Sequence, residues 1–214
     1  MEDDTAYQKY KHHRQWFNKL WLSEKLGYKC GPAGVDIPED GTYVIRPIYN
    51  LSGMGVGATV KKLKAGDRNS TPPGYFWCEY FLGTHYSANY IWQYDRDMIN
   101  GQWRDPWKGR SCWVGINMPV NVSKFVEWQR SDFVPSVTEL CDVKEINVEF
   151  IGDKVIEVHL RHSPDPDYDH IIPVWSSDLG PKKDHMEMHG YDFIEAYDDA
   201  DGHLEDPRIG FLVK

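Results

Sequence analysis

Apolar and polar residues alternate along positions 146–161, and this period of two predicts a pair of antiparallel β-strands joined by a short loop. One face of the pair is apolar. The other face carries side chains able to hold a cation or a phosphate, namely Asn147, Glu149, Glu157, His159 and Arg161. Placing the apolar side chains of both strands on one face requires a loop with an odd number of residues, most simply Gly152-Asp153-Lys154. We therefore expect Glu149 to lie opposite Glu157, and Asn147 opposite His159.

Two glutamates placed directly opposite each other destabilise a sheet, since their Cβ atoms lie only about 4.5–5.5 Å apart. A divalent cation between Glu149 and Glu157 would turn this repulsion into binding energy. Carboxylate oxygens with few other protein ligands suit Mg²⁺ that also bridges to the phosphates of a substrate. The alternative is a solvated sheet face on which the two glutamates point into water.

Elsewhere the pattern predicts one helix followed mainly by strands. Residues 7–26 form an amphipathic helix that ends at Gly27, a residue typical of helix C-termini. A connector rich in Pro and Gly follows at 30–41. Strands are expected at 42–48, 58–63, 75–82, 86–92 and 209–213. Residues 95–115 show no period and are expected to be irregular, 122–128 to be a short helix, 137–143 a helix or loop, and 191–197 a helix or strand.

A glycine-rich segment, residues 50–57, separates the first two predicted strands. Its glycines allow positive φ and a close backbone approach, so successive N–H groups would surround a phosphate. The Rossmann and Walker patterns both lead into a helix, and neither fits here. A glycine-rich hairpin that folds over a triphosphate remains, with a plain tight hairpin as the alternative. Arg46, at the end of the preceding strand, is suited to bind an α or β phosphate.

Composition narrows the class of protein. A chain of 214 residues can bury a sizeable core as one compact domain or as two small lobes around a cleft. Its net charge of −9 and its lack of a basic tract argue against a nucleic-acid partner. The four cysteines are widely spaced without CxxC, which favours a reducing, cytoplasmic location. Neither a signal sequence nor a membrane-spanning apolar run is present, so no membrane is expected.

Three motifs together resemble the ATP-grasp enzymes and follow that family's order. They are residues 43–47 with the glycine segment, residues 76–87, and residues 146–161. The resemblance covers residues 30–162, and 208–213 look like the family's closing strand. It implies an α+β fold in which two small lobes, with mainly antiparallel sheets, enclose a nucleotide cleft. The whole chain, 1–214, would form one such domain: 1–35 the helix and connector, 36–80 the small lobe with the lid, and 81–214 the large lobe with the metal hairpin.

The resemblance assigns ATP-binding roles to the first two motifs. Arg46 matches the basic residue that holds the ATP phosphates. The lid matches Ser52, Gly53, Gly55 and Gly57, and the hinge that receives adenine matches Glu79, Tyr80, Phe81 and Leu82. His85 lies where a ribose contact is often found, with a surface-loop histidine as the alternative.

The third motif supplies the metal ligands that the resemblance implies. Glu149 and Glu157 match the two Mg²⁺ carboxylates, and Arg161 matches the residue that steadies the transferred phosphate. His159 stands where the family usually has Asn. Because Mg²⁺ accepts nitrogen less readily than oxygen, this difference either lowers the occupancy of the metal site or shifts its preference toward Mn²⁺ or Zn²⁺.

The implied activity is an ATP-dependent ligase that converts a carboxylate to an acyl phosphate and joins it to an amine or thiol. A non-catalytic ATP-binding or interaction module derived from the same fold is the alternative, and a kinase-like phosphotransferase is a remoter one. Family members usually carry a substrate-binding domain ahead of the ATP-binding lobes, and here little precedes the first motif. The acceptor, a small molecule or a peptide or protein, would then be recognised by residues 95–113, by residues 163–169, or by another chain, including a second copy.

Three other groups of residues suit either a ligand-binding role or an ordinary structural role. The pair His185 and His189 suits zinc on a helix or a solvated loop. Alternating aspartates suit Ca²⁺ or an exposed turn: Asp165, Asp167 and Asp169. Aromatic and basic residues suit stacking of a flat ligand or core packing: Trp103, Arg104, Trp107, Arg110 and Trp113.

Overall fold

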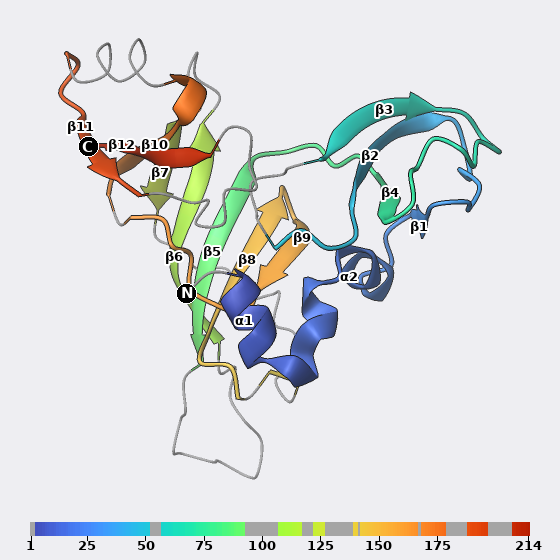
Figure 1. The fold of residues 1–214 in the computed structure, drawn as a ribbon, viewed down its shortest axis with the longest axis horizontal. Helices are drawn as coiled ribbons and strands as arrows, with labels where there is room; N and C mark the ends of the chain where they lie inside the picture. Colours follow the sequence, from blue (N-terminus) through green and yellow to red (C-terminus); the bar gives the residue numbers. More distant parts are fainter. Residues whose placement is uncertain are drawn as a thin grey trace. The chain divides into compact units, whose positions relative to one another are not determined.

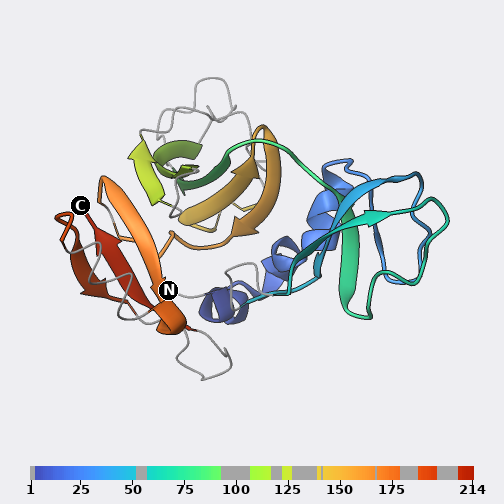
Figure 2. The same cartoon turned by 90° about the horizontal axis from the view of Figure 1, so that it is seen from above.

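The protein is represented by a computed structural model that describes residues 3–51, 57–92, 107–116, 122–126, 139–140, 142–166, 168–178, 188–196 and 207–214. At 91–92, 107–116 and 122–126 the description is of the backbone. The chain, drawn from two sides in Figure 1 and Figure 2, divides into two compact units by the contacts among its residues. The first unit contains residues 1–110 and 129–164, and the second contains residues 111–128 and 165–214.

The first unit begins with three short helical elements, and the single helix predicted for residues 7–26 is wrong. They are α1 (Asp3–Lys9), the 3-10 helix η1 (Lys11–Phe17) and α2 (Lys19–Lys25). Tyr10 (φ −100°, ψ 61°) and Asn18 (φ −86°, ψ 101°) lie between them with non-helical backbone angles. The Asn18 Oδ1 accepts a hydrogen bond from Trp21 N at 2.9 Å, so this residue caps α2. Gly27 follows α2 with φ 74°, as expected of a glycine at a helix end.

A four-stranded antiparallel sheet follows, in the order β1-β4-β2-β3. Its strands are β1 (Cys30–Pro32), β2 (Gly41–Pro47), β3 (Thr59–Leu63) and β4 (Tyr75–Glu79). The strands predicted for β2, β3 and β4 are confirmed, whereas β1 lies in a segment predicted to be a connector. The core of the sheet consists of Ile37, Tyr43, Ile45, Leu63 and Trp77.

The first unit also holds the strands that carry the predicted metal ligands. Strand β8 (Glu145–Ile151) pairs on one side with β5 (His85–Trp92) and on the other with β9 (Lys154–His159), all antiparallel (Figure 1). Glu149 lies opposite Glu157 and Asn147 opposite His159, which confirms the predicted pairing.

The loop that produces this pairing differs from the predicted one. Ile151 pairs with Lys154, so the loop has two residues, Gly152 (φ 60°) and Asp153, and the predicted three-residue loop is wrong. A β-bulge beside Phe150 places the extra residue within the strand. The bulge and the three-residue loop have the same effect on side-chain direction. Each adds one residue between the paired positions, so the apolar side chains of both strands lie on one face.

The second unit is built from antiparallel strands in the order β11-β12-β10-β7-β6. These are β6 (Trp107–Ile116), which begins in the first unit, β7 (Val122–Val126), β10 (His170–Trp175), β11 (Asp192–Glu195) and β12 (Arg208–Val213), with a short 3-10 helix η2 (Ser176–Asp178) after β10. A buried cluster of Ile172, Val174 and Leu212 packs against Phe193.

Four predictions for this unit are tested by its strands. The prediction of β12 is confirmed, and the helix-or-strand alternative at 191–197 resolves to strand β11. The helix predicted at 122–128 and the irregular structure predicted at 107–115 are wrong, since these segments form β7 and β6. Strand β10 had no counterpart among the predictions. Short apolar runs do not distinguish helix from strand, so partners in the sheet determine the outcome.

The architecture is α+β with mainly antiparallel sheets, as predicted. The boundaries of the small and large lobes at residues 36–80 and 81–214 stay a prediction. In the residues that the structure describes, no helix has the length and apolar character needed to cross a membrane. The three other groups of residues each include members outside the described parts of the chain, so both interpretations of each group stay predictions. Not described are His185, Asp167, Trp103 and Arg104, and the side chains of Trp107, Arg110 and Trp113.

Candidate nucleotide and metal site

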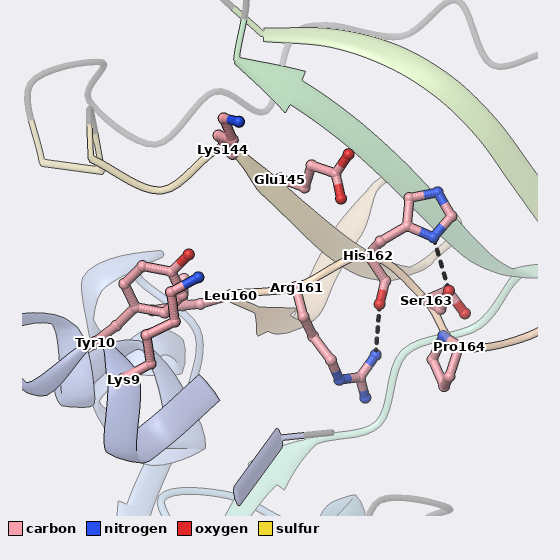
Figure 3. A pocket seen from close by; sticks show the side chains of 9 residues that line it. All are labelled: Lys9, Tyr10, Lys144, Glu145, Leu160, Arg161, His162, Ser163 and Pro164. Carbon is pink, nitrogen blue, oxygen red and sulfur yellow. Dashed lines mark hydrogen bonds between the residues drawn. The ribbon is translucent and has the colours of Figure 1, made fainter. Parts of the chain in front are cut away.

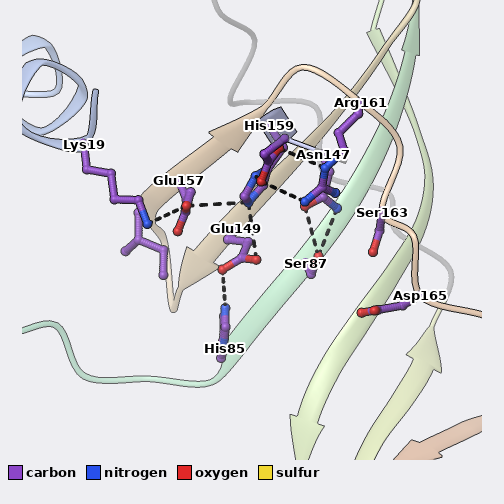
Figure 4. A network of polar contacts seen from close by, with 12 residues as sticks. Lys19, His85, Ser87, Asn147, Glu149, Glu157, His159, Arg161, Ser163 and Asp165 are labelled. Carbon is purple, nitrogen blue, oxygen red and sulfur yellow. Dashed lines mark hydrogen bonds and ion pairs between the residues drawn. The ribbon is translucent and has the colours of Figure 1, made fainter. Parts of the chain in front are cut away.

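The polar faces of β8 and β9 bring Glu149, Glu157 and His159 together (Figure 4). One ligand atom from each of the three lies within 4.8 Å of the others. The His159 Nε2 is 3.5 Å from Glu149 Oε1 and 3.9 Å from Glu157 Oε1. Two opposed glutamates thus meet across an imidazole, which is the convergence expected from the strand register.

Asp3, a residue that the sequence analysis did not single out, closes the other side of this cluster. Its Oδ2 lies 2.8 Å from His159 Nδ1 and accepts a hydrogen bond from Arg161 Nη2 at 2.9 Å. Its Oδ1 lies 2.8 Å from Arg161 Nε, within ion-pair distance. All three side chains are buried. The start of α1 is therefore held against the end of β9 by one carboxylate that contacts both His159 and Arg161.

Lys19 is a second site residue that the sequence analysis missed. Its Nζ lies 2.6 Å from Glu157 Oε1, and its side chain is only 8% exposed. The break in the helical segment positions it, because Asn18 caps α2 and the Lys19 N–H donates to Ile48 O at 2.9 Å. The signal available in the sequence was the Asn-Lys pair, in which a good N-cap residue precedes the lysine.

The charges of the cluster support one another. Burial alone would lower the pKa of His159, but Asp3 and Glu157 outweigh it and raise the pKa to about 10. Burial would raise the pKa of Glu149, and its bonds to His159 and His85 instead hold it well below the usual value. In Asp3, burial is likewise outweighed by His159 and Arg161, which lower its pKa. These shifts favour the ionised forms of Asp3 and Glu149 and the imidazolium form of His159 at neutral pH.

Strand β5 contributes a further row of polar groups. His85 Nε2 lies 3.0 Å from Glu149 Oε2, and this contact raises the pKa of His85, although its side chain is half-exposed. The Asn147 amide donates to Ser87 Oγ and to Asn89 Oδ1, both at 2.9 Å. His85 therefore sits beside the predicted metal ligands, and its ribose role stays a prediction.

Arg46 extends from β2 to the hairpin. Its Nη2 donates to Ile156 O at 3.0 Å, and its guanidinium lies 5.2 Å from the centre of the Phe76 ring. Ile156 precedes Glu157, so the structure brings Arg46 to a strand that carries predicted metal ligands. Whether Arg46 binds phosphate stays a prediction.

The predicted hinge follows the end of β4. Glu79 Oε1 accepts a hydrogen bond from Lys29 N at 2.8 Å, and Phe81 packs edge-on against Tyr28 at 4.8 Å between ring centres. Tyr80 and Leu82 are exposed, the latter to 82%. The hinge thus holds two anchored and two exposed side chains, and its adenine contacts stay a prediction.

Of the predicted lid, the structure describes only Gly57. This residue has φ 79°, and a Cβ there would lie 2.8 Å from the Tyr75 hydroxyl. Both the angle and the close approach favour glycine at this position. Ser52, Gly53 and Gly55 lie outside the described residues.

The donor set fits a divalent cation. Two carboxylates suit Mg²⁺ or Mn²⁺, and the imidazole suits Mn²⁺ or Zn²⁺. In the described site, the Lys19 ammonium and the His159 imidazolium supply the positive charge that Glu149 and Glu157 require. A metal bound by all three ligands would release the His159 proton, so its affinity would rise with pH.

Comparison of the sequence with protein-family models and with curated proteins gives no match. Solved structures do match. N5-carboxyaminoimidazole synthetase from Staphylococcus aureus, complexed with ADP, superposes with a TM-score of 0.51 at 9% identity, over 94% of this chain and 68% of that chain. A second structure of this synthetase gives 0.50 at 9% identity, over 92% and 66%. The chain has an ATP-grasp fold.

A putative ATP-grasp superfamily protein from Archaeoglobus fulgidus also matches, with a TM-score of 0.44 at 11% identity, over 93% of this chain and 64% of that chain. This chain spans between 42% and 68% of the length of the matched proteins. At 9% identity, the likeness to the two synthetase structures shows the fold alone, and the reaction has to be argued from the residues.

Proposed function

We propose that this chain binds ATP with a divalent cation and acts as a ligase, forming an acyl phosphate from a carboxylate and passing the acyl group to an amine or thiol. The observation that supports this best is the convergence of Glu149, Glu157 and His159 from two paired strands of an ATP-grasp fold. Opposed carboxylates are costly unless positive charge lies beside them, which Lys19 and His159 supply in the described site and a divalent cation would supply when bound. A buried arginine, Arg161, adjoins the cluster and carries the charge that a transferred phosphate requires.

The proposed reaction has two steps. The acceptor carboxylate oxygen attacks the γ-phosphorus of ATP, the bond to the bridging β–γ oxygen breaks, and ADP leaves. The amine nitrogen then attacks the carbonyl carbon of the acyl phosphate, phosphate leaves, and the nitrogen loses a proton. Neither step requires a side-chain nucleophile, since both depend on positioning and on offsetting negative charge.

Each residue of the cluster has a part in this scheme. Glu149, Glu157 and His159 would hold the cation, which when bound offsets charge on the phosphates. Lys19, now paired with Glu157 at 2.6 Å, supplies a nearly buried ammonium to the same place. Arg161 is oriented by Asp3 and so loses little conformational entropy on meeting an anion.

The nucleotide base would bind at the hinge. Tyr80 and Leu82 expose apolar surface, and a purine ring would remove it from water. The backbone groups of residues 79–82 would pair with the adenine edge. Arg46 would bind the α or β phosphate after exchanging its bond to Ile156 O for one to phosphate oxygen, a stronger, charge-assisted contact.

A thermal-shift titration tests nucleotide and metal binding. The melting temperature of the full chain is measured with ATP or ADP, with and without Mg²⁺ or Mn²⁺, because a ligand that binds only the folded state stabilises it. We expect stabilisation by nucleotide that depends on metal and is lost in Glu157→Gln. Glu39→Gln, which removes the same charge from an exposed glutamate, is the matched control and keeps the stabilisation.

The absence of metal-dependent stabilisation in the unmutated chain would contradict the proposal. ADP release that requires both a carboxylate and an amine distinguishes the ligase from the alternative function, a non-catalytic ATP-binding module. The module would bind ATP tightly without turnover. The proposed acceptor is a small molecule, a peptide or a protein, and a second chain is a further source of contacts to it. The proposed location is the cytosol, because Cys30 and Cys78 are free thiols.

A further inference from the structure

A cavity of about 400 Å³ lies beside the metal cluster, within the first unit (Figure 3). Small-molecule sites commonly have volumes of about 300–1,000 Å³, so this one has room for a compact metabolite. Its wall comes from the end of α1, from the start of β8 and from the chain that follows β9. The residues that the argument uses are Lys9, Tyr10, Lys144, Glu145, Arg161 and His162.

The wall of this cavity is positively charged in a protein whose net charge is −9. Three cationic residues, Lys9, Lys144 and Arg161, line it together with one acidic residue, Glu145. Arg161 is already balanced by Asp3, which lies behind it. In the part of the chain that the structure describes, neither Lys9 nor Lys144 forms an ion pair with a carboxylate. Within the described residues, the two ammonium groups at this cavity therefore have no carboxylate bound to them.

Local contacts restrain Lys9 and Arg161 at the cavity. The Lys9 Nζ lies 4.8 Å from the centre of the Tyr10 ring, a cation–π contact that limits where the ammonium can go. Arg161 Nη1 donates to His162 O at 3.3 Å, and Figure 3 shows the guanidinium beside the backbone of the segment that follows β9. This arginine bonds to Asp3 as well, so it belongs both to the cavity wall and to the cluster.

We propose that this cavity is the acceptor subsite and binds a small dicarboxylate, with one carboxylate held by Lys9 and Lys144 and the other directed toward Arg161. Lys9 and Lys144 outnumber Glu145, the one acidic residue of the described wall, so the wall suits an anionic ligand, and the volume accommodates a chain of a few carbons. The proposal rests on the proposed function, because only there does a carboxylate beside Arg161 become the group that ATP activates. It assigns acceptor recognition to the N-terminal segment together with the chain that follows β9.

The binding of dicarboxylates tests the proposal directly. Isothermal titration of the full chain with succinate or glutarate should show saturable binding, and acetate and succinamide should bind at least tenfold more weakly. Lys9→Ala and Lys144→Ala should each weaken dicarboxylate binding about tenfold, since each removes a charge-assisted contact. Lys154→Ala, at the hairpin loop, removes the same charge elsewhere and should change the affinity less than twofold. Circular dichroism confirms that the variants fold.

Three results would overturn the proposal: no saturable binding of either dicarboxylate, an equal loss of affinity in Lys154→Ala, or binding of inorganic phosphate as tight as that of succinate. ATP binding measured on the same samples separates this proposal from the proposed function. ATP binding retained in Lys9→Ala and Lys144→Ala with dicarboxylate binding reduced supports the subsite. Dicarboxylate binding in a chain that does not bind ATP would overturn the proposed function and the acceptor role with it.

Discussion

Replacing Asp3 by asparagine removes the carboxylate that neutralises His159 and Arg161. The side chain of Asp3 is 3% exposed, and its two partners are also buried, so water cannot replace the lost charge. Removing one partner of a buried ion pair costs about 3–5 kcal/mol, because it leaves the other charge uncompensated. Asparagine keeps the shape and one hydrogen bond, so we expect the free energy of unfolding to fall by about 3 kcal/mol, a large part of the roughly 5–15 kcal/mol of a typical domain.

The penalty of this substitution should depend on pH in a defined direction. The pKa of His159 is raised from 6.5 to about 10, so its contribution to stability is complete below pH 6.5 and is lost as the pH rises toward 10. The pKa of Asp3 is lowered, so its contribution is lost only in acid. Arginine side chains in general are not deprotonated in proteins, so the ion pair with Arg161 does not add to this pH dependence. The penalty is therefore expected to be larger at pH 6 than at pH 9 and to persist at pH 9.

Urea unfolding followed by tryptophan fluorescence at both pH values measures this penalty. Asp4→Asn is the matched control, since it removes the same charge from an exposed neighbour in α1 and should leave the midpoint unchanged. Hydrogen exchange of the α1 amides shows whether the segment detaches locally before global unfolding. A loss below about 1 kcal/mol at pH 6, or a penalty that grows toward pH 9, would refute the account of Asp3 as the neutralising group.

Four further outcomes are expected. Glu157→Gln leaves the nearly buried Lys19 without its partner and should lower the free energy of unfolding by about 2–3 kcal/mol in urea titrations, whereas Glu39→Gln should have no measurable effect. The unmutated chain should lose stability progressively between pH 6.5 and 10, and a flat profile would contradict the raised pKa of His159. Gly210→Ala should cost about 2 kcal/mol, since its Cβ would lie 2.2 Å from Ile194 O; an unchanged melting temperature would argue against the β11-β12 register. Phe150→Ala should cost about 3–5 kcal/mol by calorimetry, because its ring is fully buried.

The pairing of Glu149 with Glu157 was predictable from sequence, because side-chain direction in a strand has a period of two. A shift of one residue would have moved every apolar side chain of the hairpin to the other face. The alternation of residues 146–161 therefore specified the register even though the predicted loop was wrong. What the alternation requires is one extra residue between the paired positions of the two strands. A bulge beside Phe150 supplies this residue as well as a longer loop would.

The segmentation of residues 3–25 was not predictable in this way. The apolar positions fit one helix, but Tyr10 and Asn18 adopt non-helical angles so that Trp16 and Phe17 become buried. Helix propensities differ by less than about 1 kcal/mol per residue, so the burial of large aromatic side chains outweighs them. The strands β6 and β7 illustrate the same effect, since pairing with neighbours determined structures that their own residues left ambiguous.

Local alternation thus established the strands and the facing glutamates, since both depend only on neighbouring residues. Asp3 and Lys19 reached the cluster through contacts with residues more than a hundred positions away, and no local pattern encodes such a distance. The charge state of His159 likewise depends on carboxylates from separate elements, because electrostatic interaction acts through space rather than along the chain. Folding alone places these groups around one imidazole and so makes the site.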